Sequence, residues 1–232
     1  MELRGVLLDL DGTLIDQDGA TRDALRAWLP ALGVPVTAEV VAAWCDLQER
    51  HLTAWRERRI DFRQQRRNRI RDFLPLVGVA CPDEPGALDE IFGGYLHHYQ
   101  ASWRAFDDVE DMLAALAGAG LATAVLTNGT TAQQNQKLDR VGLAGRVGPV
   151  YTVEDLGVAK PHAGAFLGAC ERWGLAPGAV LSVGDRYDLD VLAARAAGLR
   201  AVHLDRRGPQ PEAIASLRDL PGVIAGGRAG RG

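Results

Sequence analysis

Hydrophobic and polar positions follow two different patterns along the chain, one before and one after residue 105. Between residues 21 and 103, apolar side chains recur every three or four positions, which is typical of amphipathic helices. The clearest stripe runs from Leu88 to Trp103. Three shorter stripes precede it, within residues 25–33, 37–55 and 61–74, and Thr37 suits the N-cap of the second. Four amphipathic helices with short connections predict a small helical bundle.

After Asp107 the pattern changes to short apolar runs that alternate with helical stretches. The runs are typical of strands and lie at residues 121–127, 149–153, 179–183 and 200–204. The helical stretches lie at residues 130–141, 162–173 and 188–197. This alternation predicts a parallel sheet with helices on both faces.

The first apolar run, residues 5–9, has a neighbouring strand only if it joins this later sheet. The helical segment is then an insertion after the first strand. We therefore expect an α/β fold with a doubly wound, Rossmann-like parallel sheet and an inserted four-helix cap. The predicted catalytic core covers residues 1–15 and 106–232, the cap covers residues 16–105, and residues 226–232 are expected to form a frayed tail.

Composition excludes several classes of protein. The chain has 232 residues, 47% of them apolar, and a formal charge of −4, which gives no net attraction to nucleic acid or anionic lipid. Its three cysteines form no CxxC pair, which fits a reducing cytoplasm. Asp9 and Asp11 interrupt the region where a secretion signal needs an apolar core. The uncharged run at residues 112–136 contains several Gly, Thr and Gln residues, so we expect no membrane span.

Four polar segments coincide with ends of the predicted strands or with the start of a helix. They are DLDGTL at residues 9–14, TNG at 127–129, KP at 160–161 and GDRYDLD at 184–190. Ligands bind at the carboxyl ends of strands in open parallel sheets, so these segments are expected to meet at one edge. Each segment alone is typical of a turn, whereas the four together in this order favour a functional site.

The acids of these segments predict a metal site. Asp9, Asp11 and Asp185, with Asp190 behind them, cannot all be buried as charges without a compensating cation. A set of oxygen ligands suits Mg²⁺, which binds a few carboxylates together with water and phosphate.

The remaining polar groups predict a phosphate site beside the metal. Thr127, Asn128 and the amide of Gly129 offer hydrogen-bond donors to phosphate oxygens, and Lys160 adds a positive charge. A carboxylate next to a phosphoryl group can attack it, so an aspartyl phosphate is chemically available. The chain has only one other lysine, Lys137, which we expect to be a dispensable surface charge on the helix after TNG.

These four motifs resemble those of the haloacid dehalogenase-like hydrolase superfamily, in the subgroup with a helical cap after the first motif. The resemblance implies that Asp9 is the nucleophile and that Asp11 is the general acid and base. It implies that Thr127 and Lys160 hold the phosphate, and that Asp9, the carbonyl of Asp11 and Asp185 bind Mg²⁺. Asp190 would orient metal-bound water or Lys160. Asp188 is expected to be a helix N-cap instead.

Within this family the residues favour hydrolysis of a small phosphorylated metabolite. Dehalogenases need no acid-base partner two residues after the nucleophile, whereas Asp11 supplies one. Carbon–phosphorus-cleaving relatives need a cap lysine, and residues 16–104 contain none. The TNG and AKP motifs resemble those of the nucleotidase and acylneuraminate-phosphatase branch.

Three alternatives stay open: a phosphoglucomutase-like transfer, a phosphate-accepting signalling domain and a catalytically inactive binding module. A signalling domain would lack both the cap and Asp11, and an inactive relative would have lost a motif residue. The arginine-rich stretch at residues 56–71 is interpreted as a solvated helix face, so no nucleic-acid partner is expected. We expect a monomer or homodimer, and the sequence does not identify the substrate.

Overall fold

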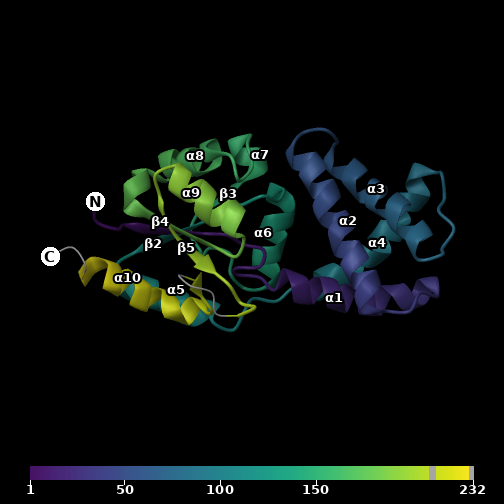
Figure 1. Ribbon diagram of the computed structural model, residues 1–232, viewed down its shortest axis with the longest axis horizontal. Coiled ribbons are helices and arrows are strands. Elements are labelled where there is room, and N and C mark those ends of the chain that lie inside the picture. Colours follow the sequence, from purple (N-terminus) through teal and green to yellow (C-terminus); the bar gives the residue numbers. More distant parts are fainter. Residues whose placement is uncertain (209–212, 230–232) are drawn as a thin grey trace. The chain divides into compact units, whose positions relative to one another are not determined.

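The computed structural model describes residues 1–208 and 213–229, which form two compact units. One unit combines Met1–Asp16 with the segment that starts at Arg104 and contains the β-sheet, and the other, Gln17–Trp103, is helical (Figure 1). The two chain segments that join the units pair with each other, because Ile15 bridges Ala105 and the Arg104 guanidinium lies 2.6 Å from the Asp16 carboxylate.

A parallel sheet forms the centre of the first unit, in the order β3-β2-β1-β4-β5-β6. The strands are β1 (Gly5–Leu8), β2 (Ala122–Thr127), β3 (Val150–Thr152), β4 (Val180–Gly184), β5 (Arg200–Leu204) and β6 (Ala213–Ile214). The predicted α/β class and parallel sheet are confirmed, and β1 does join the later strands. The sequence did not predict β6, because two residues are too few for a hydrophobic pattern.

Helices cover both faces of the sheet, and two apolar clusters hold them there (Figure 1). Leu8 and Val125 pack with α5 and α10 on one face, while Leu7 and Ala124 pack with α8 and α9 on the other. Burial on both sides explains why β1 is a continuous apolar run. The helices of this unit are α5 (Val109–Gly118), α6 (Thr131–Arg140), α7 (Val153–Leu156), α8 (Ala163–Trp173), α9 (Ala193–Ala196) and α10 (Leu220–Ala229).

The register of the central strands aligns their carboxyl ends. Leu8 is opposite both Val125 of β2 and Val183 of β4. The residues that follow these three strands therefore lie at the same edge of the sheet. Asp9 follows β1, the TNG motif closes β2, and Asp185 follows β4.

The second unit is a bundle around an aromatic core. Its helices are α1 (Gln17–Trp28), α2 (Ala38–Arg56), α3 (Phe62–Leu76) and α4 (Pro85–Ala101), with a 3₁₀ helix at Leu29–Leu32. The buried Trp44 ring of α2 has its centroid 4.9 Å from Phe73 and 4.4 Å from Tyr95, which joins three of the helices. Thr37 caps α2 as predicted, since its hydroxyl accepts from the Val40 amide.

Two local predictions need correction. The expected helix at residues 188–197 begins instead with a π-helical turn, Tyr187–Leu192, which continues into α9. Asp188 lies inside that turn, and Arg186 holds the N-cap position. Helix α10 runs through Ala229, so residues 226–229 of the expected tail are helical, and residues 230–232 lie outside the described part of the chain.

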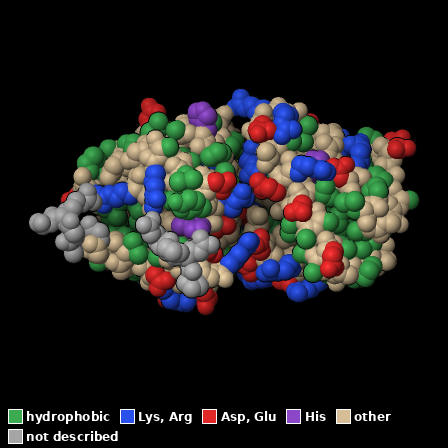
Figure 2. Space-filling view, in the orientation of Figure 1, with side chains coloured by type: hydrophobic (Ala, Val, Ile, Leu, Met, Phe, Trp, Pro, Cys, Tyr) green, Lys and Arg blue, Asp and Glu red, His purple; other side chains and the backbone are tan. Residues whose placement is uncertain are grey.

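Part of the arginine-rich stretch at residues 56–71 is paired with nearby acids. Arg67 lies 2.7 Å from Asp89, and Arg56 lies 2.6 Å from Glu49. Figure 2 shows basic and acidic side chains interspersed on the visible face of the helical unit. The interpretation of the stretch as a solvated helix face is wrong for Arg69, which is 4% exposed and donates to Gln48 and Gln65. Within the described residues, no helix has the length and apolar character needed to cross a membrane.

Candidate active site

Three of the predicted acids meet at the carboxyl edge of the sheet. Carboxylate oxygens of Asp9, Asp185 and Asp190 all lie within 4.8 Å of one another. They come from the end of β1, the end of β4 and the π-helical turn that follows. The strand register therefore brings together residues that are far apart in the sequence.

Lys160 is the cation of this cluster. Its side chain is 3% exposed, and Nζ donates to Asp9 Oδ1 at 2.6 Å and to Asp190 Oδ1 at 2.5 Å. Burial by itself lowers the pKa of Lys160, but the carboxylates of Asp190 and Asp9 outweigh this effect and raise the pKa above its ordinary value. Lys160 is thus held fully charged between two acids.

Both carboxylate oxygens of Asp190 accept hydrogen bonds from the protein. Oδ1 accepts from Lys160, and Oδ2 accepts from the Arg186 amide at 3.1 Å. Gly184 leaves room for it, because a Cβ at residue 184 would lie 2.3 Å from the Asp190 Cγ. Asp190 therefore connects Lys160 to the backbone that follows β4. Asp188, by contrast, has a side chain that is 66% exposed.

Asp9 and Asp185 carry more negative charge than their surroundings compensate. Burial is the main reason that the pKa of Asp9 rises to about 8 and that of Asp185 to about 6, and Asp190 raises both further. Asp9 Oδ2 is buried and has no hydrogen-bond partner among the described residues. An orphaned carboxylate oxygen beside a second carboxylate fits a small divalent cation.

Gly12 brings the backbone of the first motif against this acid pair. Its φ of +94° favours glycine, and a Cβ there would lie 2.5 Å from Asp185 Oδ2. Any side chain at residue 12 would therefore strike the Asp185 carboxylate. This close approach would allow the backbone of this loop to serve as a ligand of a cation bound by the two acids.

The TNG motif contributes structure as well as donors. The Asn128 side chain donates to the Lys160 carbonyl and accepts from the Lys160 amide, both at 2.8 Å. The Asn128 side chain, which we expected to face phosphate, therefore fixes the Lys160 loop to the end of β2. Thr127 is 2% exposed and Gly129 follows in the same loop.

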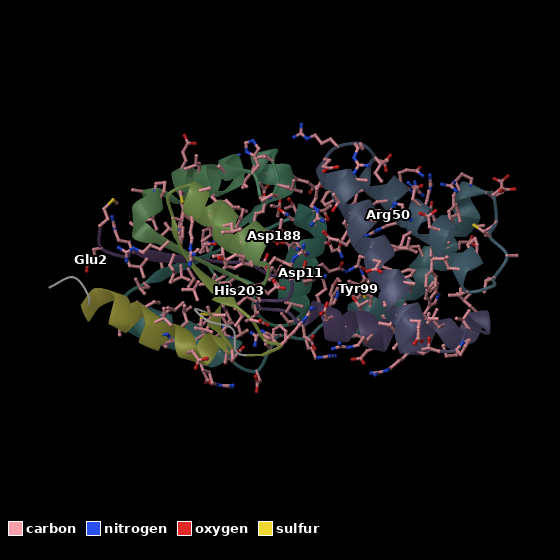
Figure 3. All side chains as sticks on the ribbon, viewed as in Figure 1. Glu2, Asp11, Arg50, Tyr99, Asp188 and His203 are labelled. Atoms are coloured by element: carbon pink, nitrogen blue, oxygen red, sulfur yellow. The ribbon has the colours of Figure 1, made fainter. Side chains whose placement is uncertain are left out.

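Asp11 has partners that the sequence did not reveal. Lys137 Nζ donates to Asp11 Oδ1 at 2.5 Å, and Gln134 Nε2 donates to Asp11 Oδ2 at 2.9 Å. Both partners come from α6, and Figure 3 labels Asp11 next to this helix. The expectation that Lys137 is a surface charge is wrong, because its side chain is only 3% exposed. Helical spacing places Gln134 and Lys137 on one face, but no pattern shows which face meets the sheet.

Comparisons with known proteins identify the family of the chain. The family model of haloacid dehalogenase-like hydrolases matches residues 3–198. A phosphoserine phosphatase of Thermus thermophilus is 36% identical over 151 residues, which are 64% of this chain and 59% of that protein. A phosphoglycolate phosphatase of Escherichia coli O157:H7 is 32% identical over 211 residues, 88% of this chain and 81% of that protein.

A solved structure of similar fold is the putative hydrolase YfnB of Bacillus subtilis, described as bound to magnesium. Its TM-score is 0.82 at 22% identity, and the match covers 97% of this chain and 100% of that chain. At this identity the likeness concerns the fold. The family model covers most of the chain, and the aligned relatives reach 30% identity or more over most of their length. The chain belongs to the haloacid dehalogenase-like hydrolases.

Proposed function

We propose that the protein is a Mg²⁺-dependent phosphomonoester hydrolase that acts through an aspartyl phosphate on Asp9. The observation that carries this proposal is the orphaned Asp9 Oδ2, which lies in an acidic cluster that one lysine neutralises only in part. Its relatives are named as phosphatases of phosphoserine and phosphoglycolate, which supports phosphomonoester chemistry.

The proposed first step is attack of the Asp9 carboxylate on phosphorus. The bond between phosphorus and the leaving oxygen breaks, and Asp11 gives that oxygen a proton. Lys160, Thr127 and the amide of Gly129 would hold the other phosphoryl oxygens and stabilise their charge. In the second step Asp11 takes a proton from water, which attacks phosphorus and releases Asp9 and inorganic phosphate.

Mg²⁺ would be held by Asp9, the carbonyl of Asp11 and Asp185, where it would neutralise charge on the phosphoryl oxygens. Asp190 is bonded to Lys160 and Arg186, so we assign it to the orientation of Lys160. The helical unit, Gln17–Trp103, is inserted directly after the first motif, and we assign it the role of a substrate-selecting cap.

The substrate class is a small phosphorylated metabolite. The presence of Asp11 and its two donors disfavours dehalogenation, because a halide leaving group needs no proton. The same residues disfavour a signalling domain, which would keep its phosphoryl group.

The test is turnover of p-nitrophenyl phosphate together with a panel that contains phosphoserine, phosphoglycolate and nucleoside monophosphates. We expect phosphate release with Mg²⁺, no release with EDTA, and recovery when Mg²⁺ is restored. The matched control is Asp9→Asn, which should be inactive under all conditions. Equal rates with and without the chelator would refute metal dependence.

A further inference from the structure

Each of the two lysines of the chain forms an ion pair with a different acid of the first motif. Lys160 binds Asp9, the proposed nucleophile, and Lys137 binds Asp11, the proposed acid and base. The sequence suggested one catalytic lysine and one surface lysine, but both Nζ atoms are buried against a carboxylate. Lys137 therefore belongs to the site, although the proposed reaction assigns it no role.

Asp11 is held at both carboxylate oxygens by one helix. Lys137 donates to Oδ1 at 2.5 Å and Gln134 donates to Oδ2 at 2.9 Å. Because each oxygen has its own donor, the carboxyl plane cannot rotate without breaking a hydrogen bond. Gln134 Nε2 also lies 2.5 Å from Thr127 Oγ1, so the same amide connects Asp11 to the proposed phosphate loop.

The place for Gln134 is built into the TNG loop. A Cβ at residue 129 would lie 2.4 Å from Gln134 Cδ, so only glycine leaves room for this side chain. Gln134 and Lys137 are 1% and 2% exposed, respectively. Burial of a lysine and an amide is costly unless their polar atoms have partners. Asp11 supplies a partner to Lys137 Nζ and to Gln134 Nε2, whereas the buried Gln134 Oε1 has no hydrogen-bond partner among the described residues.

We propose that Lys137 and Gln134 are positioning residues that fix the direction of the Asp11 carboxyl group for proton transfer to the leaving group. This inference rests on the proposed function. Gln134 donates to Asp11 and Thr127, and Lys137 donates to Asp11, so we expect both residues to act on substrate through these two side chains. Their contribution then depends on how much the leaving group needs a proton.

The leaving group separates this role from a merely structural one. p-Nitrophenolate departs readily without a proton, whereas phenolate and simple alkoxides need one. The value of kcat/KM reports the steps up to the first chemical step, in which the leaving group departs. Loss of the positioning contacts should therefore lower kcat/KM much more for phenyl phosphate than for p-nitrophenyl phosphate.

The experiment measures kcat/KM for both esters with Mg²⁺ in the wild type, Lys137→Met and Gln134→Leu. We expect about a 10²-fold loss on phenyl phosphate and less than a tenfold loss on p-nitrophenyl phosphate, within the range of general acid catalysis. Arg140→Met is the matched control, because it removes a positive charge from the exposed side of the same helix and should leave both values unchanged.

Gln134→Leu keeps the test decisive if Lys137→Met fails to fold, since it removes the amide contacts with Asp11 and Thr127 and leaves the Lys137–Asp11 ion pair in place. Equal losses on the two esters, or no loss in a folded variant, would overturn the positioning role. A wild type that hydrolyses neither ester would instead refute the proposed function, so the two failures are distinguishable.

Discussion

Replacement of Lys160 by methionine tests the charge balance of the site in the absence of metal. Lys160 is the cation bonded to Asp9 and Asp190, at 2.6 and 2.5 Å. Methionine has a similar length but no charge, so the variant leaves these buried acids without their ion pair. Breaking a buried pair by removing one partner costs about 3–5 kcal/mol of folding free energy.

The loss of unfolding free energy in Lys160→Met should increase with pH. Burial raises the pKa of Asp9 to about 8 and that of Asp185 to about 6 even with Lys160 present, and removal of the lysine raises both pKa values further. A carboxyl group with a raised pKa favours the folded state when protonated, and this contribution disappears as pH rises through the folded-state pKa. The variant should therefore lose less stability at pH 5 than at pH 9.

The size of this difference follows from the pKa shift. A shift of one pKa unit corresponds to about 1.4 kcal/mol of free energy. If the pKa of Asp9 alone rises by one further unit in the variant, the loss of unfolding free energy at pH 5 is smaller by about that amount. Asp190 loses its ion pair at both pH values, so part of the cost stays.

The assay is urea unfolding followed by circular dichroism, in EDTA, at pH 5 and pH 9. Arg140→Met controls for removal of one exposed cation and should change stability by less than about 0.5 kcal/mol. A Lys160→Met loss that is equal at the two pH values, or larger at pH 5, would refute the account of the buried charges.

Three further predictions concern single residues. Asp11→Asn should lower turnover of phenyl phosphate by about 10²–10⁴-fold, measured by steady-state kinetics, while the fold is unchanged by circular dichroism. Lys160→Arg should keep the fold but lose most activity in the same assay, because a forked guanidinium does not fit where a compact ammonium contacts two carboxylates. Asp108→Asn should lower unfolding free energy by about 3 kcal/mol in urea, because buried Asp108 accepts hydrogen bonds from Arg206, Ser216 and the Leu217 amide.

Much of the fold was predictable because its signals are local. A doubly buried strand such as β1 must be a continuous apolar run, and the run at residues 5–8 has no partner unless it joins the later strands. The acids at the carboxyl ends of β1 and β4 were predictable for a related reason. Parallel strands bring their ends to one edge, so strand order largely determines which polar residues meet.

The rest depended on tertiary contacts that leave little trace in a single sequence. Lys137 lies on a polar helix whose sequence does not show which face packs against the sheet, and its bond to Asp11 is seen only in the folded structure. The Asn128 side chain could donate a hydrogen bond to phosphate, but it bonds instead to the backbone of Lys160. Asp188 resembled an N-cap because a π-helical turn cannot be distinguished from an α-helix at this length.

The most direct test of the account is the site of covalent phosphorylation. Asp11→Asn protein, in which hydrolysis of the phosphoenzyme is slowed, is mixed with p-nitrophenyl phosphate and Mg²⁺, quenched in acid, digested and analysed by tandem mass spectrometry. We expect one phosphoryl group on Asp9, and none in a protein that also carries Asp9→Asn. Turnover by the wild type together with full activity in Asp9→Asn, or a phosphoryl group on another residue, would contradict it.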